Sequence, residues 1–201
     1  MVELIPNILT FSRLGLTAVF LTMVLYWPYV GDKPVFVDVA FVLFVVAGIT
    51  DLIDGRIARR YNVTSKFGRM IDPLVDKILV CGTFVCFAII GEPKLFELPE
   101  RTLRVVHWSV AGILILREGY VTVLRHISEA RGIDFRAVAS GKIKMILQTF
   151  AIGTVLIKMA HVQTATWGYW FTTVTFAAML AVTIVSGFAA TRRRRGLEEC
   201  S

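Results

Sequence analysis

This sequence has little of what a water-soluble protein needs. Only 18% of its 201 residues are charged, whereas 56% are hydrophobic. A soluble domain of this length would need more polar side chains to cover its surface. Cysteine is also scarce: Cys81 and Cys86 lie inside an apolar run and Cys200 lies at the tail, which excludes a disulfide framework. The composition therefore indicates an integral membrane protein.

The start of the sequence lacks the charged region and small-residue cleavage site of a removable signal peptide. We therefore expect the first apolar run to remain as a helix. The sequence also lacks zinc-finger spacing and RNA-binding aromatic motifs, although its net charge is +7. Its basic residues lie between apolar runs, where cytoplasmic loops and lipid headgroups need them. We expect membrane lipid, and no nucleic acid, as a partner.

Long apolar runs are what the sequence does contain. A membrane-spanning helix needs about 20 mainly apolar residues. Six runs meet this need, at roughly 8–30, 35–58, 72–91, 105–127, 143–162 and 168–190. Gly, Pro and charged residues separate them, and no internal repeat or low-complexity linker interrupts the series. The sequence predicts an all-α integral membrane protein of about six transmembrane helices, forming a single domain over residues 1–201.

The distribution of basic residues predicts the orientation. They gather after the second run, after the fourth run and in the tail, whereas the alternate loops also hold three glutamates. The basic residues in question are Arg56, Arg59, Arg60, Lys66, Arg69, Arg125, Arg131, Arg136, Lys142, Lys144 and Arg192 to Arg195. Because cytoplasmic loops carry an excess of Lys and Arg, both termini are expected to face the cytoplasm.

Four carboxylates occur where the second and third predicted helices meet. Asp51 and Asp54 are three residues apart, and Asp72 and Asp76 are four apart, so each pair shares a helix face. Four acids this close would repel one another, and an apolar setting would make them costly without a cation. Oxygen ligands favour Mg²⁺ or Mn²⁺, with Ca²⁺ as an alternative, and the spacing suits a two-metal site for phosphoryl transfer.

A simpler interpretation treats these acids as solvated residues at helix ends. Arg56, Arg59 and Lys77 would then be their ion-pair partners. The placement of all four acids on matching faces, with glycines at Gly55 and Gly68, favours the shared cation. The three histidines, His107, His126 and His161, are scattered and are interpreted as structural.

The acids and glycines together form one unbroken pattern, D-x2-D-G-x2-A-R-x8-G-x3-D-x3-D, which runs from Asp51 to Asp76. This pattern resembles the signature of the CDP-alcohol phosphatidyltransferases. The resemblance implies that CDP-diacylglycerol is a substrate and that the chain forms a homodimer. It also implies a bacterial inner (plasma) membrane protein whose active site faces the cytoplasm.

The resemblance also implies roles for individual residues. Asp51, Asp54, Asp72 and Asp76 would hold Mg²⁺ or Mn²⁺, and Asp76, with Asp72 beside it, would be the catalytic base. The residues on the nucleotide side would be Gly55, Ala58, Arg59, Ser65, Gly68, Asn7 and Thr10. CMP would leave as the activated hydroxyl attacks the lipid-side phosphorus.

A second set of residues concerns the acceptor alcohol. Arg117 and Glu118 lie deep in the fourth apolar run, where ionisable residues are functional by default. Several cations suit an acceptor that carries its own phosphate. The predicted phosphate-binding residues are Arg13, Arg117, Arg125, Lys142 and Lys144. The alternatives are a structural Arg117–Glu118 bridge and, for Lys142 and Lys144, ordinary positive-inside residues.

Several short segments resemble the branch of the family that converts sn-glycerol 3-phosphate to phosphatidylglycerophosphate. They include Pro6-Asn7, Arg117-Glu118 and Gly141-Lys142. Gly119-Tyr120 and the stretch from Glu129 to Ala139 depart from that branch. A sister enzyme acting on phosphatidylglycerol or inositol phosphate is therefore an alternative. Other classes are an ion transporter and a non-catalytic lipid-binding scaffold, but the acids cluster at one membrane face and the two halves look unrelated.

Overall fold

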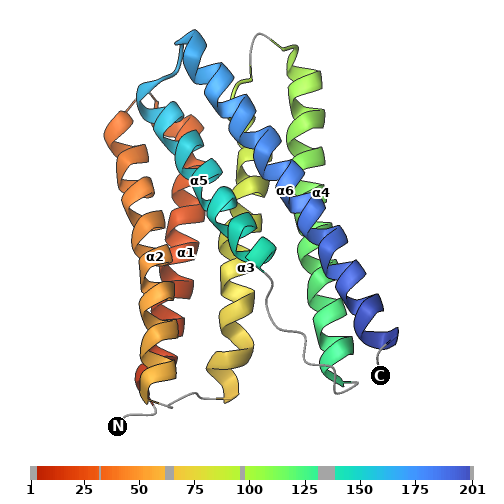
Figure 1. Cartoon of the computed structure of the whole chain (residues 1–201). Helices are drawn as coiled ribbons and strands as arrows, with labels where there is room; N and C mark the ends of the chain where they lie inside the picture. The colour runs from red at the N-terminus through yellow and green to blue at the C-terminus, as the bar shows by residue number, and fades with distance from the viewer. Residues whose placement is uncertain (1–3, 32, 62–65, 96–97, 131–138, 200–201) are drawn as a thin grey trace. The chain divides into compact units, whose positions relative to one another are not determined.

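The computed structural model describes residues 4–31, 33–61, 66–95, 98–130 and 139–199, and in these ranges it is all-helical (Figure 1). The helices are α1 (Leu4–Val30), α2 (Pro34–Tyr61), α3 (Lys66–Ile90), α4 (Glu100–Ala130), α5 (Ala139–His161) and α6 (Thr166–Glu199). Each coincides with one of the predicted apolar runs, so the all-α prediction is confirmed for the described ranges.

Among the described residues, three helices contain stretches long and apolar enough to cross a membrane. The stretches are Ser12–Val30 in α1, Ile143–His161 in α5 and Thr166–Arg193 in α6, and α2 has a shorter apolar stretch, Pro34–Thr50. In α4, the charged pair Arg117 and Glu118 interrupts the apolar sequence. The described helices therefore have the apolar character that a membrane protein requires.

The helices extend beyond the apolar runs that predicted them. α4 begins at Glu100 rather than near residue 105, and α6 continues to Glu199 rather than ending near residue 190. Gly68 falls between the predicted runs 35–58 and 72–91 and was therefore expected in a loop, but it lies in the first turn of α3, so that expectation was wrong. The first amides of a helix have no intrahelical acceptor, and a glycine costs less there than in the helix interior.

The chain divides into two compact units. The first comprises Met1–Glu92 with Leu156–Gln163, and the second comprises Pro93–Val155 with Thr164–Ser201. In the first unit, α1 packs against both α2 and α3. Figure 1 shows that the beginning of α1, the end of α2 and the beginning of α3 lie at one end of this unit. The predicted acidic motif therefore lies beside the first turns of α1.

Close contacts hold α1 against its neighbours in the first unit. The rings of Phe20 and Phe44 lie 5.4 Å apart between their centroids, and both side chains are buried. On the other side of α1, a Cβ atom built at Gly82 would lie 3.0 Å from Leu21 Cδ1. The Leu21 side chain of α1 therefore packs against the α3 backbone at Gly82, where the absence of a side chain leaves room for it.

In the second unit, α4 packs against α6. The two helices run in the same direction, and α5 runs in the opposite direction (Figure 1). The Phe150 and Phe171 rings meet edge to face at 6.2 Å between centroids. Near the start of α4, the buried His107 donates through Nε2 to the Pro93 carbonyl oxygen at 3.1 Å, which supports a structural role for this histidine.

Large apolar side chains also lie on the outside of both units. Leu116, Ile146 and Phe188 are each exposed over about two thirds or more of their surface. A soluble monomer rarely exposes apolar side chains so extensively. These exposed side chains are consistent with a membrane protein, which needs no polar exterior in the hydrocarbon layer.

Candidate functional site

The acidic motif occupies the ends of two helices of the first unit. Asp51 and Asp54 lie near the end of α2, and Asp72 and Asp76 lie near the beginning of α3. Because both pairs lie in helices, residues three or four apart lie on the same helix face, as predicted. Of these four side chains the structure describes only that of Asp76, which is half-buried.

Most of the predicted metal site lies outside the described side chains. Among the described residues, no group of three or more His, Cys, Asp or Glu side chains is placed to hold a metal ion. Asp51, Asp54 and Asp72 lie outside the residues whose side chains are described, as do the nucleotide-side residues. Those residues are Gly55, Ala58, Arg59, Ser65, Gly68, Asn7 and Thr10. The four-carboxylate site and the nucleotide pocket remain predictions.

Arg13 lies at the same end of the first unit as the motif. It is in the third turn of α1, and only 2% of its surface is exposed. A guanidinium buried in an apolar helix is costly unless it is bound by a charged or polar partner. Thr17 follows one turn later on the same face, and its buried hydroxyl has no hydrogen-bond partner in the described part of the chain. Arg13 and Thr17 are thus two buried polar residues on one face of α1, at the end of the unit that holds the acidic motif.

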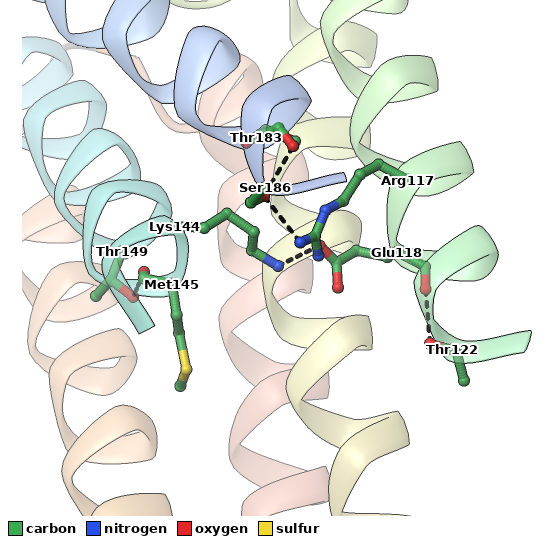
Figure 2. Close-up of polar contacts among 8 residues, drawn as sticks. All are labelled: Arg117, Glu118, Thr122, Lys144, Met145, Thr149, Thr183 and Ser186. Carbon is green, nitrogen blue, oxygen red and sulfur yellow. Dashed lines mark hydrogen bonds and ion pairs between the residues drawn. The ribbon is translucent and has the colours of Figure 1, made fainter. Parts of the chain in front are cut away.

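The clearest polar arrangement in the described residues is a network in the second unit, shown in Figure 2. Arg117 Nη1 donates to Glu118 Oε1 at 3.1 Å, and Lys144 Nζ donates to the same oxygen. Arg117 Nη2 donates to Ser186 Oγ at 2.8 Å, and Ser186 donates to the Thr183 carbonyl oxygen at 2.8 Å. We call Arg117, Glu118, Lys144 and Ser186 the α4–α6 network, since it joins α4, α5 and α6.

The burial of the α4–α6 network makes its charges important. The side chains of Arg117 and Glu118 are each 13% exposed, and that of Lys144 is 9% exposed. Solvent therefore screens these interactions far less than it would on a surface. Two cations share one carboxylate, and Arg117 Nε is buried without a hydrogen-bond partner in the described part. This donor-rich arrangement is suited to an oxyanion, for which a guanidinium is a good ligand.

The structure brings together two of the five predicted phosphate-binding residues. Arg117 and Lys144 share Glu118, as described above. Arg125, about two turns further along α4, is exposed and has no hydrogen bond or ion pair to the residues that the structure describes. The side chain of Lys142 lies outside the described residues. Arg13 belongs to the other unit.

Sequence reasoning missed Ser186, which anchors Arg117 to α6. A single serine in an apolar helix carries no motif, so nothing marked it individually. Its register was informative, however, because the buried polar residues Thr172, Thr175, Thr183 and Ser186 all lie on one face of α6. A polar strip of this kind on an apolar helix indicates a face that packs on protein or binds a polar ligand.

The sequence matches known proteins over most of its length. Residues 3–194 match the family model described as CDP-alcohol phosphatidyltransferase. A probable phosphatidylglycerophosphate synthase of Mycobacterium tuberculosis is 33% identical over 186 residues, which cover 91% of this chain and 78% of the relative. A CDP-diacylglycerol–glycerol-3-phosphate 3-phosphatidyltransferase of Bacillus subtilis is 32% identical over 161 residues, covering 76% of both chains. The protein of the same name from Salmonella choleraesuis is 32% identical over 154 residues, again covering 76% of both.

Proposed function

This chain belongs to the CDP-alcohol phosphatidyltransferase family, and we propose that it transfers the phosphatidyl group of CDP-diacylglycerol to sn-glycerol 3-phosphate. The products are phosphatidylglycerophosphate and CMP. Two observations together carry this proposal. Relatives that match most of the chain are named for this activity, and the acidic motif on α2 and α3 is unbroken. The α4–α6 network adds a buried group of donors for an acceptor that is itself a phosphate.

We propose that residues of the first unit bind the metal and the nucleotide. The donor set is all oxygen, which suits Mg²⁺ or Mn²⁺, and the two helix ends lie at the same end of the unit. Asp51, Asp54, Asp72 and Asp76 would hold the ion or ion pair. When bound, divalent metal neutralises charge on the pyrophosphate oxygens. Gly55, Ala58, Arg59, Ser65, Gly68, Asn7 and Thr10 are proposed to bind the nucleotide.

We propose that the basic side chains bind the acceptor alcohol. Arg117 and Lys144 bind the phosphate of sn-glycerol 3-phosphate, with Arg13, Arg125 and Lys142 as further phosphate ligands. Glu118 keeps Arg117 and Lys144 at a fixed spacing, since both donate to its Oε1. Prepositioned donors contribute to catalysis because they need no reorganisation when the substrate binds.

In the proposed chemical step, Asp76 takes the proton of the C1 hydroxyl of sn-glycerol 3-phosphate, and Asp72 lies one turn before it on α3. The hydroxyl oxygen forms a bond to the phosphorus that carries diacylglycerol. The bond from that phosphorus to the pyrophosphate bridging oxygen breaks, and CMP leaves with the electron pair. Because the acceptor hydroxyl attacks the phosphorus directly, in line with the leaving group, the step needs no covalent enzyme intermediate.

We propose one domain over residues 1–201 with six spans and both termini in the cytoplasm. The family match from residue 3 to 194 supports a single domain, and the basic residues near the junctions of α2 with α3 and of α4 with α5 support the orientation. The active site then faces the cytoplasm of a bacterial inner membrane. A homodimer is proposed from the family resemblance, and chemical crosslinking of the full chain in vesicles tests it.

The reaction is tested with the full chain in detergent micelles, CDP-diacylglycerol, Mg²⁺ or Mn²⁺, and radiolabelled sn-glycerol 3-phosphate. We expect labelled lipid and stoichiometric CMP from the wild type, and almost none from Asp76→Asn. Phosphatidylglycerol and inositol phosphate are supplied in parallel. Release of CMP with one of these and not with sn-glycerol 3-phosphate would assign a different acceptor. Equal turnover by Asp76→Asn and the wild type would remove the base assignment.

A further inference from the structure

Three buried polar atoms of the second unit have no hydrogen-bond partner in the described part of the chain. They are Arg117 Nε, Gln148 Nε2 and Thr183 Oγ1. Gln148 is 2% exposed and Thr183 is fully buried. Buried polar groups are nearly always hydrogen-bonded, because burial without a partner costs the desolvation of the group. Within the described ranges no residue supplies the partner that such burial demands, and a bound polar ligand would supply it.

Gln148 and Thr183 are placed in the same way relative to the α4–α6 network. Gln148 follows Lys144 by one turn on α5, and Thr183 precedes Ser186 by one turn on α6. Because α5 and α6 run in opposite directions, both residues are displaced toward the same end of the second unit (Figure 1). The displacement along each helix is about 4.5–6 Å, from a rise of about 1.5 Å per residue.

Four other threonines of α6 show that it is unusual for the Thr183 hydroxyl to have no hydrogen bond among the described residues. Thr172, Thr173, Thr175 and Thr191 each donate to the carbonyl oxygen four residues earlier, at 2.8 to 3.1 Å. This is the ordinary way for a helical threonine to satisfy its hydroxyl in an apolar setting. Thr183 has the same option at Met179 and does not use it. Figure 2 shows the Thr183 carbonyl oxygen already accepting from Ser186.

We propose that Gln148 and Thr183 recognise the C2 hydroxyl of the acceptor while Arg117 and Lys144 hold its phosphate. This inference rests on the proposed function, because it assumes that the α4–α6 network binds the acceptor phosphate. In sn-glycerol 3-phosphate, the C2 hydroxyl is on the carbon next to the one that bears the phosphate. A hydroxyl both donates and accepts, as does the threonine, and the glutamine amide donates. Gln148 and Thr183 are thus specificity-determining residues.

A site built to bond a hydroxyl rejects an analogue that lacks it, because its buried polar groups are then left unpaired. The matched analogue is 3-hydroxypropyl phosphate, which keeps the phosphate and the attacking C1 hydroxyl and lacks only the C2 hydroxyl. The experiment measures kcat/KM of the full-length enzyme for each acceptor at saturating CDP-diacylglycerol. It compares the wild type with Thr183→Val, Thr183→Ser and Gln148→Leu. Thr175→Val is the control, because the Thr175 hydroxyl bonds its own helix.

We expect the wild type to prefer sn-glycerol 3-phosphate at least tenfold, and Thr183→Val and Gln148→Leu to lose most of that preference. The loss should come from slower use of sn-glycerol 3-phosphate, with the analogue unaffected. Thr183→Ser and Thr175→Val should keep the wild-type ratio. Equal loss with both acceptors would mean a structural role and would overturn the inference.

The wild type alone also tests the inference, whether or not the variants fold. A wild type that uses both acceptors equally well would overturn it and leave the proposed reaction intact. A wild type that makes no lipid from sn-glycerol 3-phosphate would overturn the proposed function, and the inference with it.

Discussion

The replacement of Ser186 by alanine isolates the contribution of α6 to acceptor binding. In the wild type, Ser186 Oγ accepts from Arg117 Nη2 at 2.8 Å, and both side chains are largely buried. Ser186→Ala removes this acceptor and leaves the bond from Arg117 to Glu118. The guanidinium then loses one of the two hydrogen bonds that it makes to described side chains. We expect weaker binding of the acceptor phosphate, with the chemistry of the nucleotide unaffected.

The magnitude follows from the charge and burial of the bond. A hydrogen bond to a charged group contributes about 1.5–3 kcal/mol. Since about 1.4 kcal/mol corresponds to a factor of ten, kcat/KM for sn-glycerol 3-phosphate should fall about ten- to hundredfold. The KM for CDP-diacylglycerol should stay within about twofold, because the predicted nucleotide residues lie on α1, α2, α3 and the segment before α3.

The assay measures initial rates of CMP release while each substrate is varied separately. Thr191→Val is the matched control, because Thr191 also joins α4 to α6 through a hydroxyl, 3.0 Å from the Tyr120 hydroxyl. That bond is exposed and neutral, so its loss should change the acceptor KM less than about threefold. If Ser186→Ala and Thr191→Val behaved alike, or if both substrates' KM values rose together, the assignment of Arg117 to the acceptor phosphate would be refuted.

Three further predictions test other parts of the molecule. Treatment with EDTA should abolish labelled-lipid formation, and Mg²⁺ or Mn²⁺ should restore it; full activity in the chelator would contradict the carboxylate site. Glu118→Gln should raise the KM for sn-glycerol 3-phosphate and lower the thermal unfolding temperature in detergent. The reason is that loss of one buried ion partner costs about 3 kcal/mol or more. An unchanged melting curve would contradict a stabilising role for Glu118. Gly82→Leu should destabilise the first unit by about 1–3 kcal/mol through a clash with Leu21, whereas Gly15→Ala on α1, in open space, should have little effect in the same scan.

The number and type of helices could be predicted because apolar runs of membrane length are visible in the sequence. The ends of the helices could not be predicted, because an apolar run marks the part of a helix that matches the hydrocarbon layer and does not mark its last hydrogen-bonded turn. Glu100 and Glu199 are unfavourable in hydrocarbon but compatible with a helix in water, so α4 and α6 continue beyond the apolar stretch. Gly68 was misplaced for a related reason: a glycine was taken as a break, although a helix tolerates it in its first turn.

The candidate site was predictable where charge marked it. Arg117, Glu118 and Lys144 attracted notice as ionisable residues in or beside apolar runs, and the structure connects all three. Ser186, Gln148 and Thr183 were missed, because their importance comes from contacts between helices distant in the chain. Arg117 and Ser186, for example, are 69 residues apart. Helical periodicity gives the face on which a residue lies but not the partner that the face meets.

The self-bonded threonines of α6 have a consequence for how the chain enters the bilayer. Their hydroxyls are satisfied by their own helix, so this segment brings few exposed donors into lipid and can insert on its own. The Arg117–Glu118 segment of α4 differs, because an arginine at the centre of a lone helix opposes insertion by about 2.5–3.5 kcal/mol. Lys144, which donates to Glu118, and Ser186, which accepts from Arg117, are synthesised after that pair. In the six-span arrangement proposed above, stable residence of α4 in the membrane would depend on segments that leave the ribosome later, and truncation after α4 should leave that helix poorly integrated.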